Sequence, residues 1–385
     1  MDENMIERNL KPILKKSKKS ILVLGPRQTG KSTLLKSIQP DLVLNLAHEP
    51  TYLEFVRNPG ELEARLEGRG YQSVFIDEVQ RLPSLLNTIQ VLIDDAKKPL
   101  QFYLSGSSAI KLKRGHANLL PGRIHTYFLG PVVASELSYK MDLSEALSTG
   151  TLPGIWTEKA KSQKTKTLES YAGTYLKEEI QQEALVRGVE GFSRFLYVAA
   201  SEAGKFLDIS KLASQAQIPR QSAVRYFEIL EDTLLIRRCE TFRKSLRRRL
   251  VQSPRFFFFD AGVWNGLLGN FIVSGDRLGP LFEQFIFNQI AHSADSKDKK
   301  IRISSYRTEH GAEVDFVLET GSKVIGLEVK SQNSISRIDL RGMKSFQEYT
   351  GKKTQCFVVY PGKVSKRIDG VEILPWQVFL KNMGL

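Results

Sequence analysis

A glycine-rich octapeptide near the amino end constrains this chain more than any other feature. Residues 25–32 read GPRQTGKS; they follow the apolar run Ile21–Leu24 and open an apolar-periodic stretch that ends near Ile38. This order predicts a strand, a loop and a helix N-terminus. Successive backbone N–H groups of such a loop can wrap a phosphate, and the helix dipole favours the phosphate charge. The spacing therefore predicts a P-loop that binds a nucleoside triphosphate.

Two side chains of this loop have specific expected roles. Lys31 is expected to reach the β- and γ-phosphates, and the Ser32 hydroxyl can bind Mg²⁺. The alternative is a turn that happens to be rich in glycine. The residues expected to contact ATP are Gly25, Pro26, Arg27, Gln28, Thr29, Gly30, Lys31, Ser32 and Thr33.

Alternating apolar strands and helical stretches fill residues 20–140, which predicts an α/β domain with a parallel sheet and crossover helices. One apolar run, 73–77, ends in two acids. Asp77 is expected to hold Mg²⁺ through the water shell of the metal or through Ser32, and Glu78 to polarise the attacking water. The expected strands are Ile21–Leu24, Leu42–Leu46, Ser73–Asp77, Gln101–Ser105 and Thr126–Leu129.

Two further groups are candidates for the same site. Ser105 or Ser107, at the tip of the strand beside the acidic one, can touch the γ-phosphate or the water, and we favour Ser105; the alternative is a capped turn. Arg123 is a candidate for charge stabilisation, either within the subunit or across an interface.

These residues resemble a known group. GPRQTGKS, the sequence IDEVQ (76–80), SGSS (105–108), and PGR (121–123) followed by Leu129-Gly-Pro and Glu136-Leu137 look like AAA-type ATPases of bacteria and archaea that carry a C-terminal domain of undefined function. The resemblance spans nearly the whole chain. It implies a switch-like ATPase that couples a P-loop core to a winged helix and a nuclease-like module. Ser32 stands where Thr is frequent, which preserves the metal-binding hydroxyl, and no lid arginine matches clearly.

The length, composition and net charge of the chain limit the class of protein. With 385 residues, 41% apolar and 25% charged, the chain predicts a soluble protein of two or three domains. The net charge of +14 favours a polyanionic partner such as nucleic acid, although a generally basic proteome would give the same value. Two distant cysteines support neither a disulfide framework nor a zinc cluster, and fit a cytoplasmic location. We expect no signal peptide and no membrane span.

The middle of the chain has the pattern of a winged helix-turn-helix. Pro153 and Gly154 indicate a boundary, after which a helical stripe over 164–186 predicts a packing surface. Two short helices, 209–216 and 220–235, flank a turn, and the strands 236–240 and 255–260 follow. Seven cations lie on or beside the predicted wing, where they could neutralise phosphates, but acids on the second helix would oppose this. These cations are Arg237, Arg238, Arg243, Lys244, Arg247, Arg248 and Arg249.

The last part of the chain predicts a nuclease-like constellation. Glu283 lies on an apolar-faced helix, Asp315 lies in one strand, and Glu328 and Lys330 lie on one face of the next. A hairpin at Thr320-Gly321 can set Asp315 beside them. Asp315 and Glu328 could share Mg²⁺, Glu283 could complete its shell, and Lys330 could activate water. The pattern resembles the restriction-endonuclease-like fold.

Together these patterns predict three parts: a P-loop ATPase domain at 1–150, a helical connector and winged helix at 151–265, and a nuclease-like α/β domain at 270–385. The first functional hypothesis is an ATP-regulated switch that acts on DNA. The alternative is a signalling or scaffold ATPase whose later domains bind proteins and never cut. A homo-oligomer or a protein partner is compatible with either.

Overall fold

The computed structural model describes residues 6–95, 99–107, 122–175, 189–243, 253–351 and 354–385. They form two compact units: one mainly of residues 1–130 and one mainly of residues 131–385. Each unit is built around one sheet.

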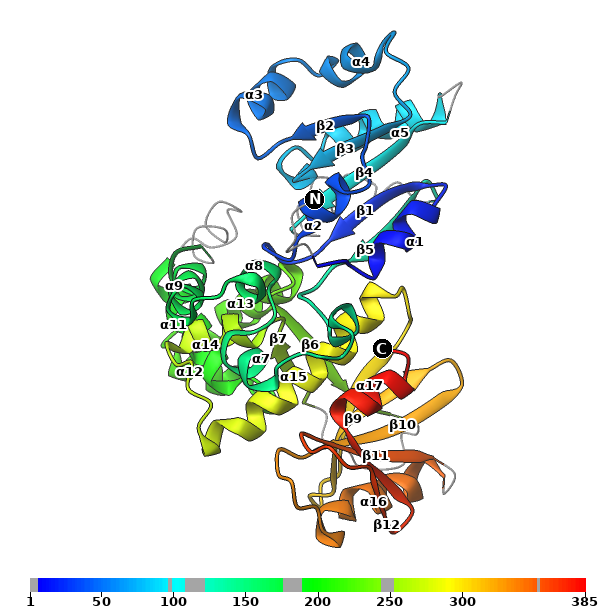
Figure 1. The fold of residues 1–385 in the computed structure, drawn as a ribbon. Coiled ribbons are helices and arrows are strands. Elements are labelled where there is room, and N and C mark those ends of the chain that lie inside the picture. Colours follow the sequence, from blue (N-terminus) through cyan, green and yellow to red (C-terminus); the bar gives the residue numbers. More distant parts are fainter. Residues whose placement is uncertain (1–5, 96–98, 108–121, 176–188, 244–252, 352–353) are drawn as a thin grey trace. The chain divides into compact units, whose positions relative to one another are not determined.

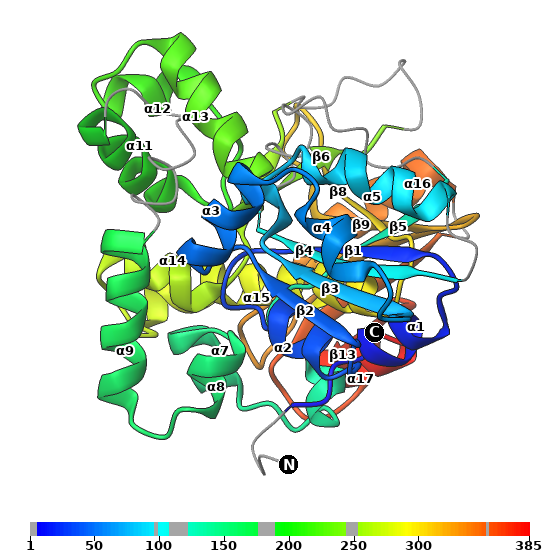
Figure 2. The ribbon, with the colours of Figure 1, turned by 90° about the horizontal axis from the view of Figure 1, so that it is seen from above.

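The first unit contains the parallel sheet that the sequence predicts. Five strands lie in the order β2-β3-β4-β1-β5, and every neighbouring pair is parallel; the two views show them side by side (Figures 1 and 2). The elements are α1 (Leu10–Lys16), β1 (Ser20–Leu24), α2 (Lys31–Lys36), β2 (Leu42–Asn45), α3 (Glu49–Arg57), α4 (Glu61–Leu66), β3 (Ser73–Asp77), the short 3₁₀ helix η1 (Val79–Arg81), α5 (Leu85–Asp94), β4 (Gln101–Gly106) and β5 (Ile124–Phe128).

Both faces of this sheet are covered at its buried central strand β1, because successive apolar side chains of a strand point to opposite faces. Leu22 and Leu24 of β1 pack with residues of α3, α4 and α5 in one core. Ile21 and Val23 pack with residues of α1 and α2 in another. The strand order places the carboxyl ends of β1, β4 and β3 side by side, so the segments that follow these strands meet at one edge.

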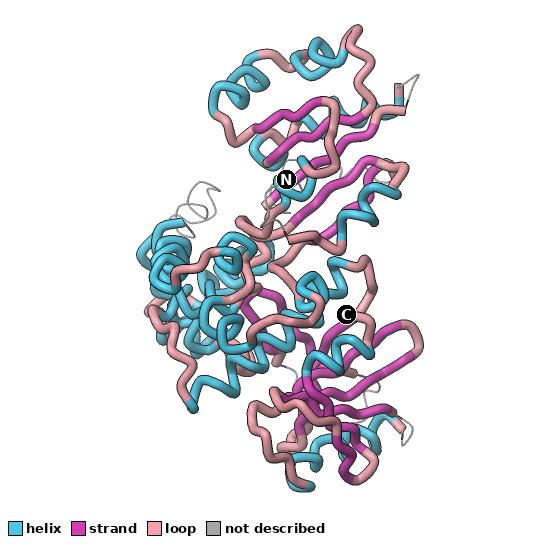
Figure 3. The backbone as a smooth tube through the Cα atoms, viewed as in Figure 1, coloured by secondary structure: helices cyan, strands magenta, loops and turns pink. Residues whose placement is uncertain are grey.

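The second unit holds a sheet of eight strands, β12-β13-β11-β10-β9-β8-β6-β7 (magenta in Figure 3). Its strands are β6 (Ile236–Thr241), β7 (Arg255–Phe258), β8 (Arg302–Arg307), β9 (Glu313–Thr320), β10 (Lys323–Val329), β11 (Gln355–Tyr360), β12 (Lys366–Ile368) and β13 (Val371–Pro375). Its helical elements are η2 (Ala134–Leu137), α7 (Leu143–Thr149), α8 (Pro153–Thr157), α9 (Lys161–Ser170), the π-helix η3 (Tyr171–Tyr175), α11 (Val189–Glu202), α12 (Ile209–Gln215), α13 (Arg220–Asp232), α14 (Ala261–Leu268), α15 (Gly275–Ser296), η4 (Arg337–Leu340), α16 (Arg341–Thr350) and α17 (Trp376–Asn382).

The two helices and the hairpin expected between 209 and 260 are present, since β6 and β7 pair antiparallel. The hairpin is not isolated, however. β6 also pairs parallel with β8, through Glu240 with Ser304 and Thr241 with Ser305. One sheet therefore contains strands from both sides of residues 265–270, where the sequence predicts a domain boundary.

Candidate functional site

The P-loop lies between β1 and α2, as its sequence requires. Gln28 and Gly30 have φ of 61° and 88°, the left-handed backbone that curls a loop into an anion-binding concavity. Lys31 opens α2, and its buried ammonium donates to the carbonyl oxygens of Gly25 (2.8 Å) and Pro26 (2.9 Å). The loop thus holds its cation against its own backbone, at the position where a phosphate would approach.

A hydroxyl and carboxylate network joins the loop to the neighbouring strands. Ser32 Oγ donates to Asp77 Oδ1 at 2.8 Å, and Ser105 Oγ donates to the same oxygen. Ser105 also accepts from the backbone N–H of Glu78 at 3.0 Å. Predicted residues from α2, β3 and β4 are therefore brought together, with Asp77 at their centre.

Mg²⁺ fits this donor set. A hydroxyl and a carboxylate oxygen in contact are hard ligands of the kind that Mg²⁺ shares with nucleotide phosphates. Ser32 and Asp77 would hold the metal, and it would supply charge neutralisation on the phosphates.

Glu78 is held in a strained backbone conformation, with φ 59° and ψ 45°. The side chain of Gln80 donates to Glu78 Oε2 and, at 2.9 Å, to Ser107 Oγ. Gln80 is 2% exposed. Glu78 is thus fixed by Gln80, a residue to which the sequence patterns assigned no role. The signals for it are its place two residues after the acid and its position in the sequence IDEVQ, which carries the family resemblance.

A second unpredicted residue supports the loop. Arg8 is buried, and its guanidinium donates to the carbonyl oxygens of Thr29 (2.7 Å) and Gly130 (2.8 Å). Nothing in the sequence around Arg8 indicates this contact, because its partners are distant along the chain.

The structure does not bring Arg123 to the loop. Arg123 precedes β5, whose Ile124 pairs with Ser20 at the start of β1, so it lies at the opposite edge of the parallel sheet. There its guanidinium forms two hydrogen bonds with Asp94, at 2.6 and 2.9 Å. A role within the subunit does not fit this position, and a role across an interface stays a prediction.

The second predicted constellation lies in the second unit, and its members are close together. The β9–β10 hairpin sets Asp315 beside the end of β10, where its Oδ2 accepts from Val329 N at 2.7 Å. Lys330 Nζ donates to Glu328 Oε1 at 2.8 Å. Glu283 on α15 pairs with Arg255, with 2.5 Å between Nη2 and Oε1.

The electrostatics of this cluster disfavour three ionised carboxylates. Burial, followed by the negative charge of Asp315, raises the pKa of Glu328, and the nearby Lys330 opposes this only in part. Burial also raises the pKa of Glu283 against the opposing effect of Arg255. Burial alone would lower the pKa of Lys330, but the Glu328 carboxylate raises it above its usual range.

A catalytic Mg²⁺ does not fit here. Within the part of the chain that the structure describes, no group of three or more His, Cys, Asp or Glu side chains is arranged to hold a metal. Glu283 faces a guanidinium and Glu328 faces an ammonium, so the expected ligands are already paired with cations.

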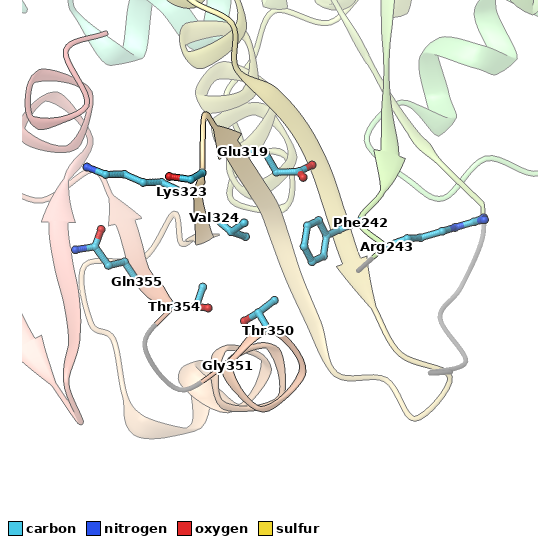
Figure 4. Close-up of a pocket in the computed structure, with 10 residues that line it drawn as sticks. Phe242, Arg243, Glu319, Lys323, Val324, Thr350, Gly351, Thr354 and Gln355 are labelled. Carbon is cyan, nitrogen blue, oxygen red and sulfur yellow. The ribbon is translucent and has the colours of Figure 1, made fainter. Parts of the chain in front are cut away.

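A separate cavity of about 730 Å³ opens in the second unit (Figure 4). None of the residues predicted for the P-loop site or for the nuclease-like cluster lines it, whereas Arg243 of the predicted wing does. Its charged side chains are Arg243, Glu319 and Lys323, and Phe242 and Val324 form part of its wall.

Among the described residues, no helix is both long and apolar enough to cross a membrane.

Three known families match successive parts of the chain. Residues 17–138 match one described as an AAA domain, and this range contains the P-loop, Asp77, Glu78 and Ser105. This part of the chain is therefore similar to an AAA domain. Residues 140–272 and 278–379 match two domains of unknown function, DUF8612 and DUF4143.

Two similar proteins come from mycobacteria. The proteins Rv2008c of Mycobacterium tuberculosis and Mb2031c of Mycobacterium bovis, both described as uncharacterized, are each 25% identical over 352 residues. These residues span 89% of this chain and 76% of theirs.

Solved structures are similar only at a low level. The replication initiator DnaA bound to AMPPCP and single-stranded DNA is 12% identical, with 60% of this chain and 90% of that chain covered and a TM-score of 0.28. A signal transduction ATPase with a tetratricopeptide repeat sensor from Pyrococcus horikoshii is 13% identical, with 74% and 45% covered and a TM-score of 0.25. At these TM-scores neither structure defines the fold or the partners of this chain.

Proposed function

We propose that this chain binds ATP with Mg²⁺ at the P-loop and hydrolyses it, and that hydrolysis switches the state of the second unit. The observation that carries the proposal is the network of Ser32, Asp77, Ser105 and Glu78 around the loop. Lys31 would neutralise the β- and γ-phosphates. Glu78 would accept a proton from the water that attacks the γ-phosphate in line.

The test separates binding from turnover. Glu78→Gln keeps the shape of the side chain but removes its basicity, so ATP binding should persist while kcat falls by about 10²-fold or more. Lys31→Ala should lose binding itself. Matched controls are Glu63→Gln and Lys36→Ala, two exposed residues on α4 and α2. Turnover by Glu78→Gln at the wild-type rate would contradict the proposal.

We further propose that the segment from α12 to β7 contacts nucleic acid. The support is its helix-turn-helix and hairpin, together with a cation-rich sequence. Four of the cations, Lys244, Arg247, Arg248 and Arg249, lie outside the described residues. Arg243 is exposed at the end of the β6 segment.

One observation favours the alternative, a scaffold whose second unit binds proteins. Arg238 is bound at both ends of its guanidinium by Glu231 of α13, at 2.9 and 2.5 Å, which reduces its availability to a phosphate. Binding of labelled duplex DNA at several salt concentrations distinguishes the two. A nucleic-acid role predicts a log–log slope of about −0.9 for each phosphate contact, and loss of binding on changing Arg247, Arg248 and Arg249 to Ala. No binding at low salt would favour the scaffold.

A further inference from the structure

The acidic cluster of Glu283, Asp315 and Glu328 contains a buried cation of the chain itself. Arg255 is the first residue of β7, where it pairs with Cys239, and it is 4% exposed. It lies far from the cluster in sequence. A basic side chain at a strand start gives no indication of such a position.

The guanidinium of Arg255 is fixed from two sides. Nε donates to the carbonyl oxygen of Gly204 at 2.6 Å, and Nη2 lies 2.5 Å from Glu283 Oε1. The rings of Phe257, Phe206 and Phe316 lie 5.1, 5.8 and 5.8 Å from its central carbon. Rings at these distances attract the guanidinium through cation–π interactions and so stabilise its buried position.

The electrostatic field at the Arg255 guanidinium comes from carboxylates that the sequence predicts as metal ligands. The negative charges of Glu283 and Asp315 both stabilise the protonated guanidinium. The third carboxylate, Glu328, has its own cation in Lys330. A divalent ion placed among these carboxylates would meet two positive charges at short range, in a buried site where repulsion is poorly screened.

We propose that Arg255 is the resident cation of this cluster and occupies the position that a divalent metal takes in a nuclease. The cluster is then a buried joint between β7, α15 and the β9–β10 hairpin, in which Arg255 and Lys330 offset the charge of the carboxylates. It is not a metal-dependent cleavage site. Wild-type protein therefore nicks no DNA in Mg²⁺ or Mn²⁺ through Asp315.

The first test measures thermal unfolding of the nucleotide-free full-length protein. Arg255→Met leaves Glu283 buried without its partner and should lower the unfolding midpoint by about 10 °C. The matched control is Arg307→Met. Arg307 lies 3.8 Å from Glu313 but its side chain is 40% exposed, so the midpoint should change by no more than about 2 °C. Equal small shifts for both variants would overturn the proposal.

The second test asks whether a metal can replace the guanidinium. Arg255→Ala vacates the position, so millimolar Mn²⁺ should restore part of the lost midpoint, and it should fail to do so in the double variant with Asp315→Asn. The wild-type midpoint should respond to Mn²⁺ no more than that of Asp315→Asn alone. A wild-type response that Asp315→Asn abolishes, or an unresponsive Arg255→Ala, would overturn the proposal.

A third measurement needs no change at Arg255, in case those variants fail to fold. The electron paramagnetic resonance signal of free Mn²⁺ is recorded with nucleotide-free wild type and with Asp315→Asn. The proposal expects equal signals from the two proteins. Depletion of free Mn²⁺ by the wild type alone would show a metal site and refute it.

Discussion

At the scale of single residues, Gly25 is a position where the P-loop leaves no room for a side chain. A Cβ built there would lie 2.1 Å from the carbonyl oxygen of Leu129 and 3.3 Å from Thr29 Oγ1. The backbone of the loop would have to move, and with it the amides that would face the phosphate. We expect Gly25→Ala to weaken ATP binding at least tenfold, because the loop loses its shape.

Titration of a fluorescent ATP analogue measures this effect. The control is Gly154→Ala, because no atom lies within 4 Å of a Cβ at Gly154 and its φ is not positive. That variant should bind as the wild type does. Unchanged affinity in Gly25→Ala would mean that the contact with Leu129 does not shape the loop.

Gln80 is expected to act on the reaction through Glu78. Its amide holds the carboxylate that would orient the water, and it donates hydrogen bonds to Glu78 and Ser107. Gln80→Leu preserves the volume but removes the donor. We expect kcat to fall about tenfold while the Kd for ATP is unchanged, as for a residue that positions a catalytic group.

Separate measurements of Kd and kcat check this expectation. Gln101→Leu is the matched control, since the Gln101 amide donates to the carbonyl oxygens of Ser17 and Lys19, at the other edge of the sheet. A parallel loss of Kd and kcat in Gln80→Leu would instead indicate that Gln80 supports the fold of the whole site.

At the scale of elements, local signals predicted the strands and the loop of the first unit, because apolar runs, turn residues and the glycine pattern act over a few positions. They also predicted that Asp315 and Glu328 share a hairpin. The position of Arg123 follows from the direction of the strands. Arg123 precedes β5, so it lies at the amino ends of the parallel strands, whereas the P-loop follows the carboxyl end of β1.

Contacts distant in sequence could not be predicted. The pairing of Glu240 with Ser304 joins the β6–β7 hairpin to β8 and so to the rest of the eight-stranded sheet. The sequence of neither strand indicates that it pairs with the other. Arg255 is similar, because its position near Glu283 and Asp315 depends on the packing of α15 and β9 against β7. Such contacts depend on the pairing and burial of strands that are distant in the chain. The local pattern of a single sequence does not predict this pairing.

A buried carboxylate at the N-terminus of α14 is expected to make the stability of the fold depend on pH. Asp260 caps this helix, fully buried, and accepts from Val263 N at 3.0 Å and from Thr151 N at 2.7 Å. Burial, opposed by these hydrogen bonds, raises its pKa from 3.8 to about 6. The folded state therefore binds this proton more tightly than the unfolded state does.

The contribution of Asp260 to stability is fully present below about pH 4 and is lost as the pH rises to about 6. Two pKa units correspond to about 3 kcal/mol. In Asp260→Asn this dependence should vanish, with a constant loss from the unpaired Thr151 amide. Urea unfolding at several pH values measures it. An unchanged slope between pH 4 and 6 in the variant would show that other groups produce the dependence.

At the scale of the whole molecule, the division into two compact units leads us to expect that nucleotide stabilises the first unit more than the second. The residues that would hold ATP all lie in the first unit, within 25–33 and at Asp77. A ligand that binds only the native form stabilises the element that binds it by RT ln(1 + [L]/Kd), about 2.7 kcal/mol at a hundredfold excess over Kd.

Scanning calorimetry of the full-length protein should therefore show two transitions, of which ATP with Mg²⁺ raises one. The shifted transition is assigned by Lys31→Ala, which should abolish its response to nucleotide, and by Arg255→Met, which should lower the other transition. If ATP raised both transitions equally in the wild type, the stabilities of the two units would be coupled, and the binding energy at the P-loop would then stabilise the second unit as well. Only in that case would a strong thermodynamic coupling between ATP binding and the second unit exist before hydrolysis.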